Sequence, residues 1–503
     1  MKHRVYNIAP GRAGLCAMAA VIALLSWMCV SPTVRAQDVP LAWSRPLWLN
    51  EGQDGNSPDV VADSSGAVHV FWGSYGGDDG PAAIYYRRLQ DGVWSDPVDI
   101  IAGPDTERAV MPQAAIDTQG WLHLVWDSNG IFYSRAPVTR AGSAWAWSRP
   151  LRLSEAQATT PQIIVDDAGR LHVVYVDMFV SPHVRYTASE DGGENWTTPV
   201  AVSAPQNEAY ALNARLLVDR QRTLHVVWSE SIEAFPPSGV YYARSTDLGQ
   251  SWSAPLELAA GGYSWTSIGL DGAGTLHVFW TGTAEWVGKY HTRSEDGGLS
   301  WRPFERLWPG TGGLLGFADM AVDSAGTLHL VSAAGSGTFF SVKTPGEILH
   351  ATWLGDRWSV PSHISSPMMN TNHEHNSPKI SIERGNVVHV VWTMLNQEPD
   401  NRGQYEYIWY ATARLSAPEL PAVPVPEPLP ASAAEVKASF TPATSKNNPA
   451  PTAVASDWPA ALPADAPAPP SPLAAVGLAV APVLALVVFV VLRQFATRSS
   501  RRW

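Results

Sequence analysis

Short apolar runs alternate with turn residues along most of this chain, from about residue 41 to residue 415. In the copy that spans residues 57–100, runs rich in β-branched and aromatic residues occupy 57–63, 67–72, 84–88 and 93–100. Such runs, bounded by Gly, Asp, Ser and Pro, predict strands, and no stretch keeps a helical period. Each copy is therefore predicted to form an antiparallel blade of four strands, named a, b, c and d.

Strand b carries the most regular signal, D-x-x-G-x-x-H followed by an apolar residue and, three residues after the His, an aromatic residue. Its histidines, 49 to 60 residues apart, are His69, His123, His172, His225, His277, His329 and His389. Six residues earlier stand Asp63, Asp117, Asp166, Asp219, Asp271, Asp323 and Glu383. Three residues later stand Trp72, Trp126, Tyr175, Trp228, Trp280, Ser332 and Trp392. A period near 50 is typical of a propeller or a solenoid.

The repeated His and acidic residues are predicted to be structural. A buried polar group needs a partner, so each His is expected to tie strand b to the preceding turn. Seven copies around a ring cannot all belong to one active site, and the Trp residues are expected in the core by the same reasoning.

Strand d has its own signature, W-S-x-P or a near form, which begins at Trp43, Trp94, Trp147, Trp196, Trp252, Trp301 and Trp358. The first copy precedes any strand a, and the last a–b–c set, which ends near Arg414, has no strand d after it. Residues 41–50 are therefore predicted to supply strand d of the last blade, which removes an open sheet edge. The prediction is an all-β, seven-bladed propeller of four-stranded blades within residues 37–415.

Three c–d turns fit S-x-D-x-G-x-x-W, at residues 189–196, 245–252 and 294–301. Asp is expected to fold back on its own backbone, Gly to take a positive φ, and Trp to anchor the hairpin. This motif is the Asp-box, and the repeat region resembles the sialidase-like, Asp-box (BNR) repeat propellers. Members of this superfamily include hydrolases, lyases and binding proteins, and sialidases themselves have six blades.

The two ends predict export and anchoring. Lys2, Arg4 and Arg12 precede an apolar run at 13–30, which is typical of a signal peptide cleaved after Ala36, with an uncleaved anchor as the alternative. Residues 416–472 are rich in Pro and Ala and predict a disordered stalk. Residues 473–492 carry no charge and are long enough to cross a bilayer, and residues 493–503 form a basic cytoplasmic tail. The propeller is thus predicted on the extracytoplasmic side of a cell membrane.

Composition narrows the partners. Both cysteines, Cys16 and Cys29, lie in the predicted signal peptide, so thiol and disulfide chemistry is not expected in the mature chain. Outside the two predicted end segments, 26 basic residues stand against 46 acidic residues, which argues against nucleic acid and anionic lipid. A glycan or a surface protein is the expected partner, and the propeller is expected to be monomeric.

The d–a and b–c loops vary from blade to blade, so function is expected on their face of the propeller. Four residues before each repeat acid, on the innermost strand, every copy has a polar residue, expected to ring the channel mouth. These residues are Asp59, Gln113, Gln162, Arg215, Ser267, Asp319 and Lys379. They indicate either a solvated ring or a mixed-charge ligand site.

Other candidates lie in the long loops. Glu230, and Glu285 beside Trp286, suit a sugar that stacks on an aromatic ring. No cofactor is expected from the sequence, but two pairs are metal candidates: His373 with His375, and, for calcium, Asp78 with Asp79.

A binding module for glycans or proteins is the preferred interpretation, and a purely structural envelope protein is another. The alternative is a sialidase-like glycoside hydrolase of the exo-α-sialidase class, or another carbohydrate-active enzyme. The resemblance implies three Arg that clamp a carboxylate, a Tyr nucleophile backed by Glu, and an acid. The family's opening Arg-Ile-Pro segment is absent, since Ser44-Arg45-Pro46 stands there. The catalytic candidates are Arg108, Arg215, Arg402, Tyr405 and Glu406.

Overall fold

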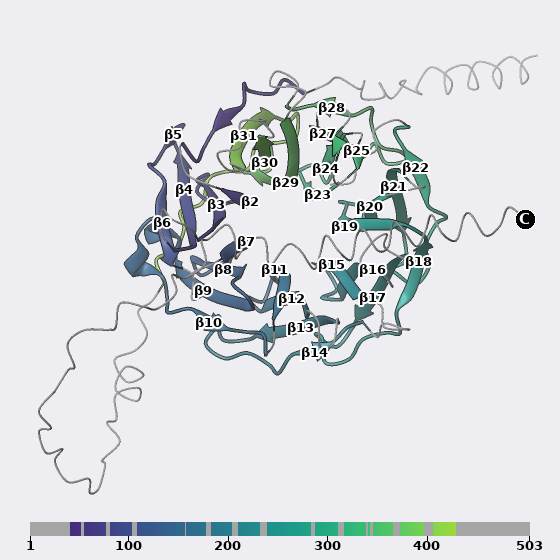
Figure 1. Ribbon diagram of the computed structural model, residues 1–503, viewed down its shortest axis with the longest axis horizontal. Coiled ribbons are helices and arrows are strands. Elements are labelled where there is room, and N and C mark those ends of the chain that lie inside the picture. Colours follow the sequence, from purple (N-terminus) through teal and green to yellow (C-terminus); the bar gives the residue numbers. More distant parts are fainter. Residues whose placement is uncertain are drawn as a thin grey trace, which may run out of the picture. The chain divides into compact units, whose positions relative to one another are not determined.

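The computed structural model is a β-propeller whose sheets are arranged in a ring (Figure 1). The structure describes residues 41–51, 55–76, 81–102, 108–155, 157–177, 183–203, 210–231, 239–282, 287–309, 316–335, 337–338, 341–342, 346–365, 373–396 and 406–428. All of them fall in the compact unit Met1–Pro430, and the second unit, Ala431–Trp503, lies outside the described residues.

Five of the blades are separate antiparallel sheets of four strands. One consists of β11 (Ala158–Val165), β12 (Leu171–Asp177), β13 (Val184–Ser189) and β14 (Val200–Ala201). The next consists of β15 (Tyr210–Val218), β16 (Leu224–Ser231), β17 (Gly239–Ser245) and β18 (Leu256–Ala260). It is followed by β19 (Tyr263–Leu270), β20 (Leu276–Gly282), β21 (Gly288–Ser294) and β22 (Glu305–Leu307). Then come β23 (Ala318–Val322), β24 (Leu328–Ala334), β27 (Glu347–Thr352) and β28 (Ser362–His363).

The fifth separate sheet joins the two ends of the repeat region. It consists of β29 (His373–Glu383), β30 (Val387–Asn396), β31 (Glu406–Arg414) and the N-terminal β1 (Leu47–Trp48). Leu47 pairs with Tyr410 and Trp48 with Trp409, so the predicted closure by the first W-S-x-P strand is confirmed. A separate short hairpin pairs β25 (Gly337–Thr338) with β26 (Ser341–Val342).

The remaining strands form one nine-stranded sheet. It contains β2 (Asn56–Ala62), β3 (Val68–Tyr75), β4 (Ala83–Gln90), β5 (Val93–Trp94), β6 (Val98–Ala102), β7 (Arg108–Ile116), β8 (Trp121–Asp127), β9 (Ile131–Pro137) and β10 (Leu151–Arg152). Two repeats share this sheet because Ser74 and Tyr75 at the end of β3 pair with Ala109 and Arg108 of β7. The prediction of seven separate blades is corrected accordingly: five repeats form blades of their own, and two are joined.

Strand d departs from prediction in the copy at residues 93–100, because it is split into β5 and β6 around Pro97. Proline has no N–H to donate to a ladder, so pairing stops there. The Ser of W-S-x-P recurs because its hydroxyl accepts a hydrogen bond from a backbone N–H of strand c. Ser95 accepts from the Arg88 N–H at 3.0 Å, and Ser44 accepts from the Thr412 N–H at 3.0 Å. Two 3-10 helices, η1 (Val138–Arg140) and η2 (Ala144–Ala146), lie between β9 and β10.

The repeat His residues are buried and structural, as predicted. The Nε2 atom of His69 lies 3.2 Å from the Asp63 carboxylate across the a–b turn, and Nδ1 lies 2.8 Å from the Tyr86 hydroxyl of strand c. The same acid–His contact, at 3.0 to 3.4 Å, recurs in the other six repeats. His291 and His350 replace the Tyr in two of them. The repeat Trp residues are fully buried.

The S-x-D-x-G-x-x-W turns have the expected geometry. Asp191 accepts hydrogen bonds from the Ser189 hydroxyl at 2.8 Å and from the Asn195 N–H at 2.9 Å, and Gly193 has a φ of 94°. Gly249 and Gly298 take the same left-handed conformation in the other two turns. These turns therefore fix the outer hairpins of their blades.

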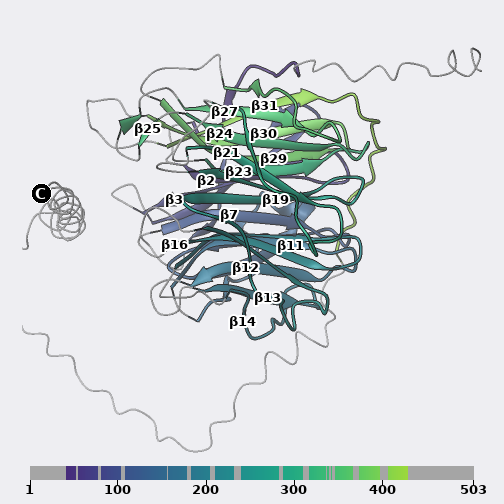
Figure 2. The same cartoon turned by 90° about the vertical axis from the view of Figure 1, so that its right-hand side faces the viewer.

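Residues 415–428 cross the a–b turns of four successive repeats (Figure 2, yellow-green). The Ser324 hydroxyl donates to the Pro418 carbonyl oxygen, Arg384 donates to the Leu420 carbonyl oxygen, and Val425 packs against the hydrophobic core of the first two repeats. The expected disordered stalk therefore does not begin at residue 416, because these residues have partners on the propeller. Among the described residues, no helix is long and apolar enough to cross a membrane, and the segment 473–492 falls outside them.

Candidate functional site

The inner strands share a β-bulge at one repeat position, near their start on the d–a loop face. The register shifts just before Asp59, Gln113, Gln162, Arg215, Ser267 and Lys379 in six inner strands. Within each bulge one non-glycine residue has a φ between 45° and 57°: Ser57, Met111, Thr160, Asn213, Trp265 and Ser377. A left-handed conformation is unfavourable for such residues, and strained positions of this kind gather at functional sites.

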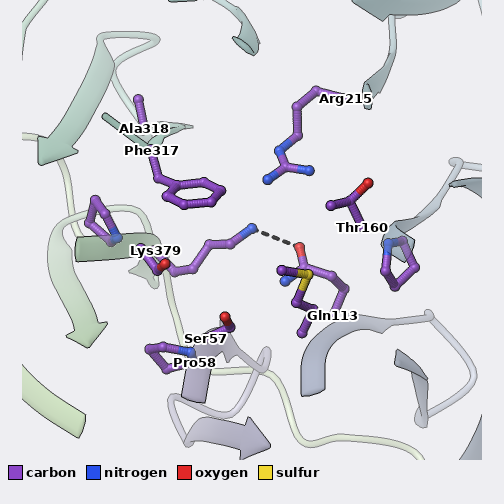
Figure 3. A pocket seen from close by; sticks show the side chains of 12 residues that line it. Ser57, Pro58, Gln113, Thr160, Arg215, Phe317, Ala318 and Lys379 are labelled. Carbon is purple, nitrogen blue, oxygen red and sulfur yellow. Dashed lines mark hydrogen bonds between the residues drawn. The ribbon is translucent and has the colours of Figure 1, made fainter. Parts of the chain in front are cut away.

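The bulges open a small pocket at the channel mouth (Figure 3). Its volume is about 40 Å³. It is lined by Ser57, Pro58, Met111, Gln113, Thr160, Pro161, Arg215, Phe317, Ala318, Ser377, Pro378 and Lys379. Six inner strands thus contribute to one site, and four of the twelve lining residues, Ser57, Met111, Thr160 and Ser377, are bulge residues.

The predicted polar ring exists, but three of its members hold neighbouring inner strands together. Asp59 accepts a hydrogen bond from the Ala114 N–H at 2.7 Å, Gln162 accepts one from Leu216 at 2.7 Å, and Asp319 accepts one from Ile380 at 3.1 Å. Each acceptor thus bonds to the residue that follows the ring position of the next repeat. These side chains have a structural use and are turned toward the backbone.

Asp59 is buried, and desolvation raises its pKa to about 6 although the nearby Lys379 ammonium opposes the shift. Lys379 Nζ lies 4.0 Å from Asp59 and donates to Gln113 Oε1 at 2.7 Å. Figure 3 shows this bond between the two side chains. Gln113 and Lys379 therefore form a pair that connects two inner strands and still faces the pocket.

Arg215 differs from the other ring members. Its guanidinium extends into the pocket (Figure 3), where Nη1 donates to the carbonyl oxygen of Ala214 at 3.0 Å. Its Nε atom is buried and has no hydrogen-bond partner among the described residues, and the same holds for Oγ1 of Thr160. Burial lowers the pKa of Arg215, and the Asp319 and Asp59 carboxylates oppose that shift. Two orphaned polar atoms in one pocket indicate a place for a ligand or for water.

An aromatic pair stands on the same wall. The Trp265 and Phe317 ring centroids are 4.0 Å apart with an interplanar angle of 46°. Phe317 also lines the pocket, and both residues are only half-buried. The site therefore combines a small polar pocket with an apolar surface beside it.

Of the residues proposed for catalysis, the described ones do not converge with Arg215. Arg108 forms an ion pair with Asp127, and Glu406 accepts a hydrogen bond from Asn56 at 2.7 Å. Arg402 and Tyr405 lie outside the described residues, as do Glu285 and Trp286. Glu230 is buried and accepts a hydrogen bond from the Trp228 indole at 2.9 Å, so it is held in the blade.

The metal candidates are not assembled in the described part of the chain. Groups of three or more His, Cys, Asp or Glu suited to a metal are absent from the described residues. His375 is buried, with Nδ1 accepting from the Trp392 indole at 2.8 Å. The side chain of His373 and both Asp78 and Asp79 fall outside the described residues.

The sequence held one overlooked signal for the bulges. Proline follows the bulge residue in four inner strands, at Pro58, Pro112, Pro161 and Pro378. Within a sheet, proline is confined to edges, strand starts and bulges, so these prolines could have located the bulges on inner strands.

Comparisons with known proteins agree with the fold. No family model matches the chain, and no curated protein matches it. Among solved structures, the BP39L lectin from Burkholderia pseudomallei is similar at 13% identity and a TM-score of 0.53, covering 74% of this chain and 99% of the lectin. A PL25 polysaccharide lyase, an ulvan lyase, is similar at 14% identity and a TM-score of 0.52, covering 74% and 97% of the two chains.

An intramolecular trans-sialidase from Ruminococcus gnavus also matches, with 11% identity, a TM-score of 0.42, and coverage of 74% and 97%. The β-propeller fold that the predicted resemblance implies is confirmed, and the similarities to the lectin and the lyase concern the fold alone. Similarity at this identity says nothing about which residues act.

Proposed function

We propose that this propeller recognises a glycan at the channel mouth, on the face formed by the d–a and b–c loops. The pocket beside the Trp265–Phe317 pair carries the proposal. Carbohydrate sites combine an aromatic face, which packs on the apolar side of a sugar, with a few polar groups that orient it. Here the aromatic pair supplies the first part, and Arg215 and Thr160 supply the second.

Two further considerations support a binding role. Solved propellers of this fold include a lectin and a polysaccharide lyase, so the scaffold is compatible with glycans as ligands. Most retaining glycosidases use two carboxyl groups about 5 Å apart, and sialidases use a Tyr nucleophile together with an acid, so both need a carboxylic acid at the scissile bond. Among the described residues that line the pocket, none has a carboxylate. Binding without cleavage is therefore the better match to this site.

We also propose that the chain acts at the cell surface, as a seven-unit ring tethered by residues 473–492. Dividing the nine-stranded sheet at the β3–β7 pairing gives seven units of a, b, c and d strands. The last described residues, up to Pro428, lie along the a–b turns, away from the pocket at the opposite ends of the inner strands. A C-terminal anchor is thus compatible with a pocket open to a ligand.

A glycan array probed with the full chain in mild detergent tests the binding proposal. We expect a restricted set of glycans to be retained, and Trp265→Ala to reduce their retention at least tenfold. Leu299→Ala is the matched control, since Leu299 is an exposed apolar residue on a c–d turn. The proposal fails if no glycan is retained above background. Release of a shortened or unsaturated product in a parallel incubation would instead indicate an enzyme.

A further inference from the structure

The lining of the pocket is cationic, whereas the chain as a whole is acidic. Its lining includes two cationic side chains, Arg215 and Lys379, and no acidic side chain among the described residues. The whole chain has a formal net charge of −12 at pH 7. A cationic lining within an acidic protein points to an anionic ligand.

Two acidic side chains, Asp59 and Asp319, lie outside the lining and partly balance these cations: Asp59 is 4.0 Å from Lys379 Nζ, and both carboxylates act on Arg215. Each also accepts a hydrogen bond from a backbone N–H of the next inner strand. They lower the cost of keeping two cations in the channel without occupying the place where a ligand would sit. The positive groups thus face the pocket, and the negative groups hold the strands.

Hydrogen-bond donors in the pocket are also left over. Arg215 uses Nη1 on Ala214, and its Nε has no partner among the described residues. Lys379 has three N–H bonds and donates one to Gln113, with Asp59 4.0 Å away. Hydroxyl groups of Ser57, Thr160 and Ser377 complete the polar wall. Arg and Lys donors bind carboxylates and sulfates through charge-assisted hydrogen bonds.

Size determines how much of a ligand can enter. A pocket of about 40 Å³ is well below the roughly 300–1,000 Å³ of sites that enclose a whole small molecule. It exceeds the ~10–15 Å³ that one water needs, so it has room for a substituent of a few atoms. A sugar ring would remain outside, next to Phe317 and Trp265.

We propose that the Arg215–Lys379 pocket binds the anionic substituent of a glycan, a carboxylate or a sulfate ester, while the sugar ring packs on Phe317 and Trp265. This inference rests on the proposed glycan recognition and names the class of glycan. The orphaned donors of Arg215 and Thr160 become satisfied when the anion enters. Neutral glycans would be expected to bind on the aromatic surface alone, and more weakly.

Calorimetric titration of the full chain in mild detergent tests the inference, with glucuronate, glucose 6-sulfate and glucose as probes. We expect at least one of the two anions to bind tenfold or more tightly than glucose. Arg215→Gln should remove that preference, and Arg215→Lys should restore part of it. Arg357→Gln is the control, because Arg357 is exposed on a c–d turn and pairs only with Asp356 among the described residues.

Melting curves guard against a folding artefact, and Lys379→Gln provides a second variant that should weaken anion binding. Equal affinity for all three probes in the wild type, or unchanged anion affinity in both folded variants, overturns the inference. A failure of the glycan proposal gives a different result. In that case the array retains no glycan, whereas glucuronate or glucose 6-sulfate still binds to the wild type and Arg215→Gln still abolishes this binding. Carboxylate and sulfate are distinguished by which of the two anions binds.

Discussion

The N–H of Val423 donates to the Ser64 carbonyl oxygen at 2.7 Å, and the Ser64 hydroxyl donates back to the Val423 carbonyl oxygen at 2.9 Å. Three residues earlier, the Leu420 N–H donates to the Arg384 carbonyl oxygen at 2.9 Å. Ser64 belongs to the a–b turn of the first repeat and Arg384 to that of the last. The segment 415–428 therefore bridges the seam where the ring closes, in addition to the β1–β31 pairing.

Val423→Pro is expected to loosen this second closure. Proline removes the N–H that Ser64 accepts, so we expect a loss of about 1 kcal/mol in the free energy of unfolding. Urea unfolding at constant m-value measures it, and Ala422→Ser serves as control because Ala422 is exposed and keeps its N–H. If Val423→Pro and Ala422→Ser unfold at the same urea concentration, the segment does not contribute to closure.

The primary closure depends on Asn50, which is fully buried. Its Oδ1 accepts from the Ile408 N–H at 2.8 Å and from the Trp48 indole at 2.6 Å, and its Nδ2 donates to Glu406 at 3.0 Å. Asn50→Ala leaves buried groups on β31 unpaired, so we expect a loss of about 2–4 kcal/mol in stability.

Ser365→Ala is the matched comparison for Asn50→Ala. Ser365 has the equivalent place and accepts one bond, from the Ile348 N–H at 2.9 Å, within a blade made of contiguous chain. We expect it to cost about 1 kcal/mol. A loss for Asn50→Ala no larger than that for Ser365→Ala would argue against a special role of Asn50 in the seam.

The contrast between the fold and the site shows what a single sequence can determine. The closure of the ring, the strands of each blade and the His–acid contacts were predictable because their sequence motifs recur in several repeats. A motif that recurs at one repeat position indicates a structural role. The location of the polar residues at the channel mouth was predictable, since Arg215 and Asp319 stand at one repeat position. The sequence did not show which of these side chains accept a hydrogen bond from the next strand and which keep free donors. That difference depends on the backbone N–H groups of Ala114, Leu216 and Ile380 in the neighbouring strands.

Lys289 provides a pH-dependent test of the core. It is fully buried and donates to Thr281 Oγ1 at 3.0 Å and to the Ala333 carbonyl oxygen at 2.6 Å. Burial lowers its pKa to about 7, whereas in the unfolded chain it stays near its ordinary 10.5. Between these values the unfolded state binds one more proton, so the free energy of unfolding should rise with pH from about 7 toward 10.

Lys289→Met should remove this rise. The difference in unfolding free energy between wild type and Lys289→Met, measured by urea denaturation at several values from pH 7 to about 9.5, should therefore increase in favour of the wild type. A difference that stays constant over that range would mean that Lys289 remains charged in the folded protein.

The repeat histidines predict the same direction of pH dependence, but in the acid range. Desolvation lowers the pKa of His172 to about 4. As the pH falls from about 6.5 to 4, the unfolded chain takes up a proton that the folded chain refuses, so this contribution to stability is lost. His172→Gln should make the decline shallower, although the variant starts from a lower stability.

Urea unfolding at pH 6.5, 5.5 and about 4.5 measures that slope for His172→Gln. His363→Gln is the comparison, because His363 on β28 is an exposed histidine that pairs with Glu347 rather than a buried one. Parallel declines for wild type and His172→Gln would show that His172 is not kept neutral by the fold.

Thr160 and Asn213 permit a reciprocal test of strain at the channel mouth. Both occupy the same bulge position, with φ of 50° and 52°. A left-handed conformation costs a β-branched residue roughly 1–2 kcal/mol, whereas Asn adopts it more readily. Thr160→Asn should therefore raise the free energy of unfolding by about 1 kcal/mol, and Asn213→Thr should lower it by at least as much, since Asn213 Nδ2 also donates to Ser264 at 3.4 Å.

Urea unfolding of the two variants and of the double exchange measures these effects. The two substitutions should change the free energy of unfolding with opposite signs, because the ring holds the backbone in the left-handed conformation whichever residue occupies the bulge position. Thr160 has the costlier side chain at the position that lines the pocket, which is understandable if its hydroxyl is kept there for a ligand. If Thr160→Asn is destabilising, the bulge is not strained, and the Thr160 hydroxyl contributes to folding rather than to ligand binding.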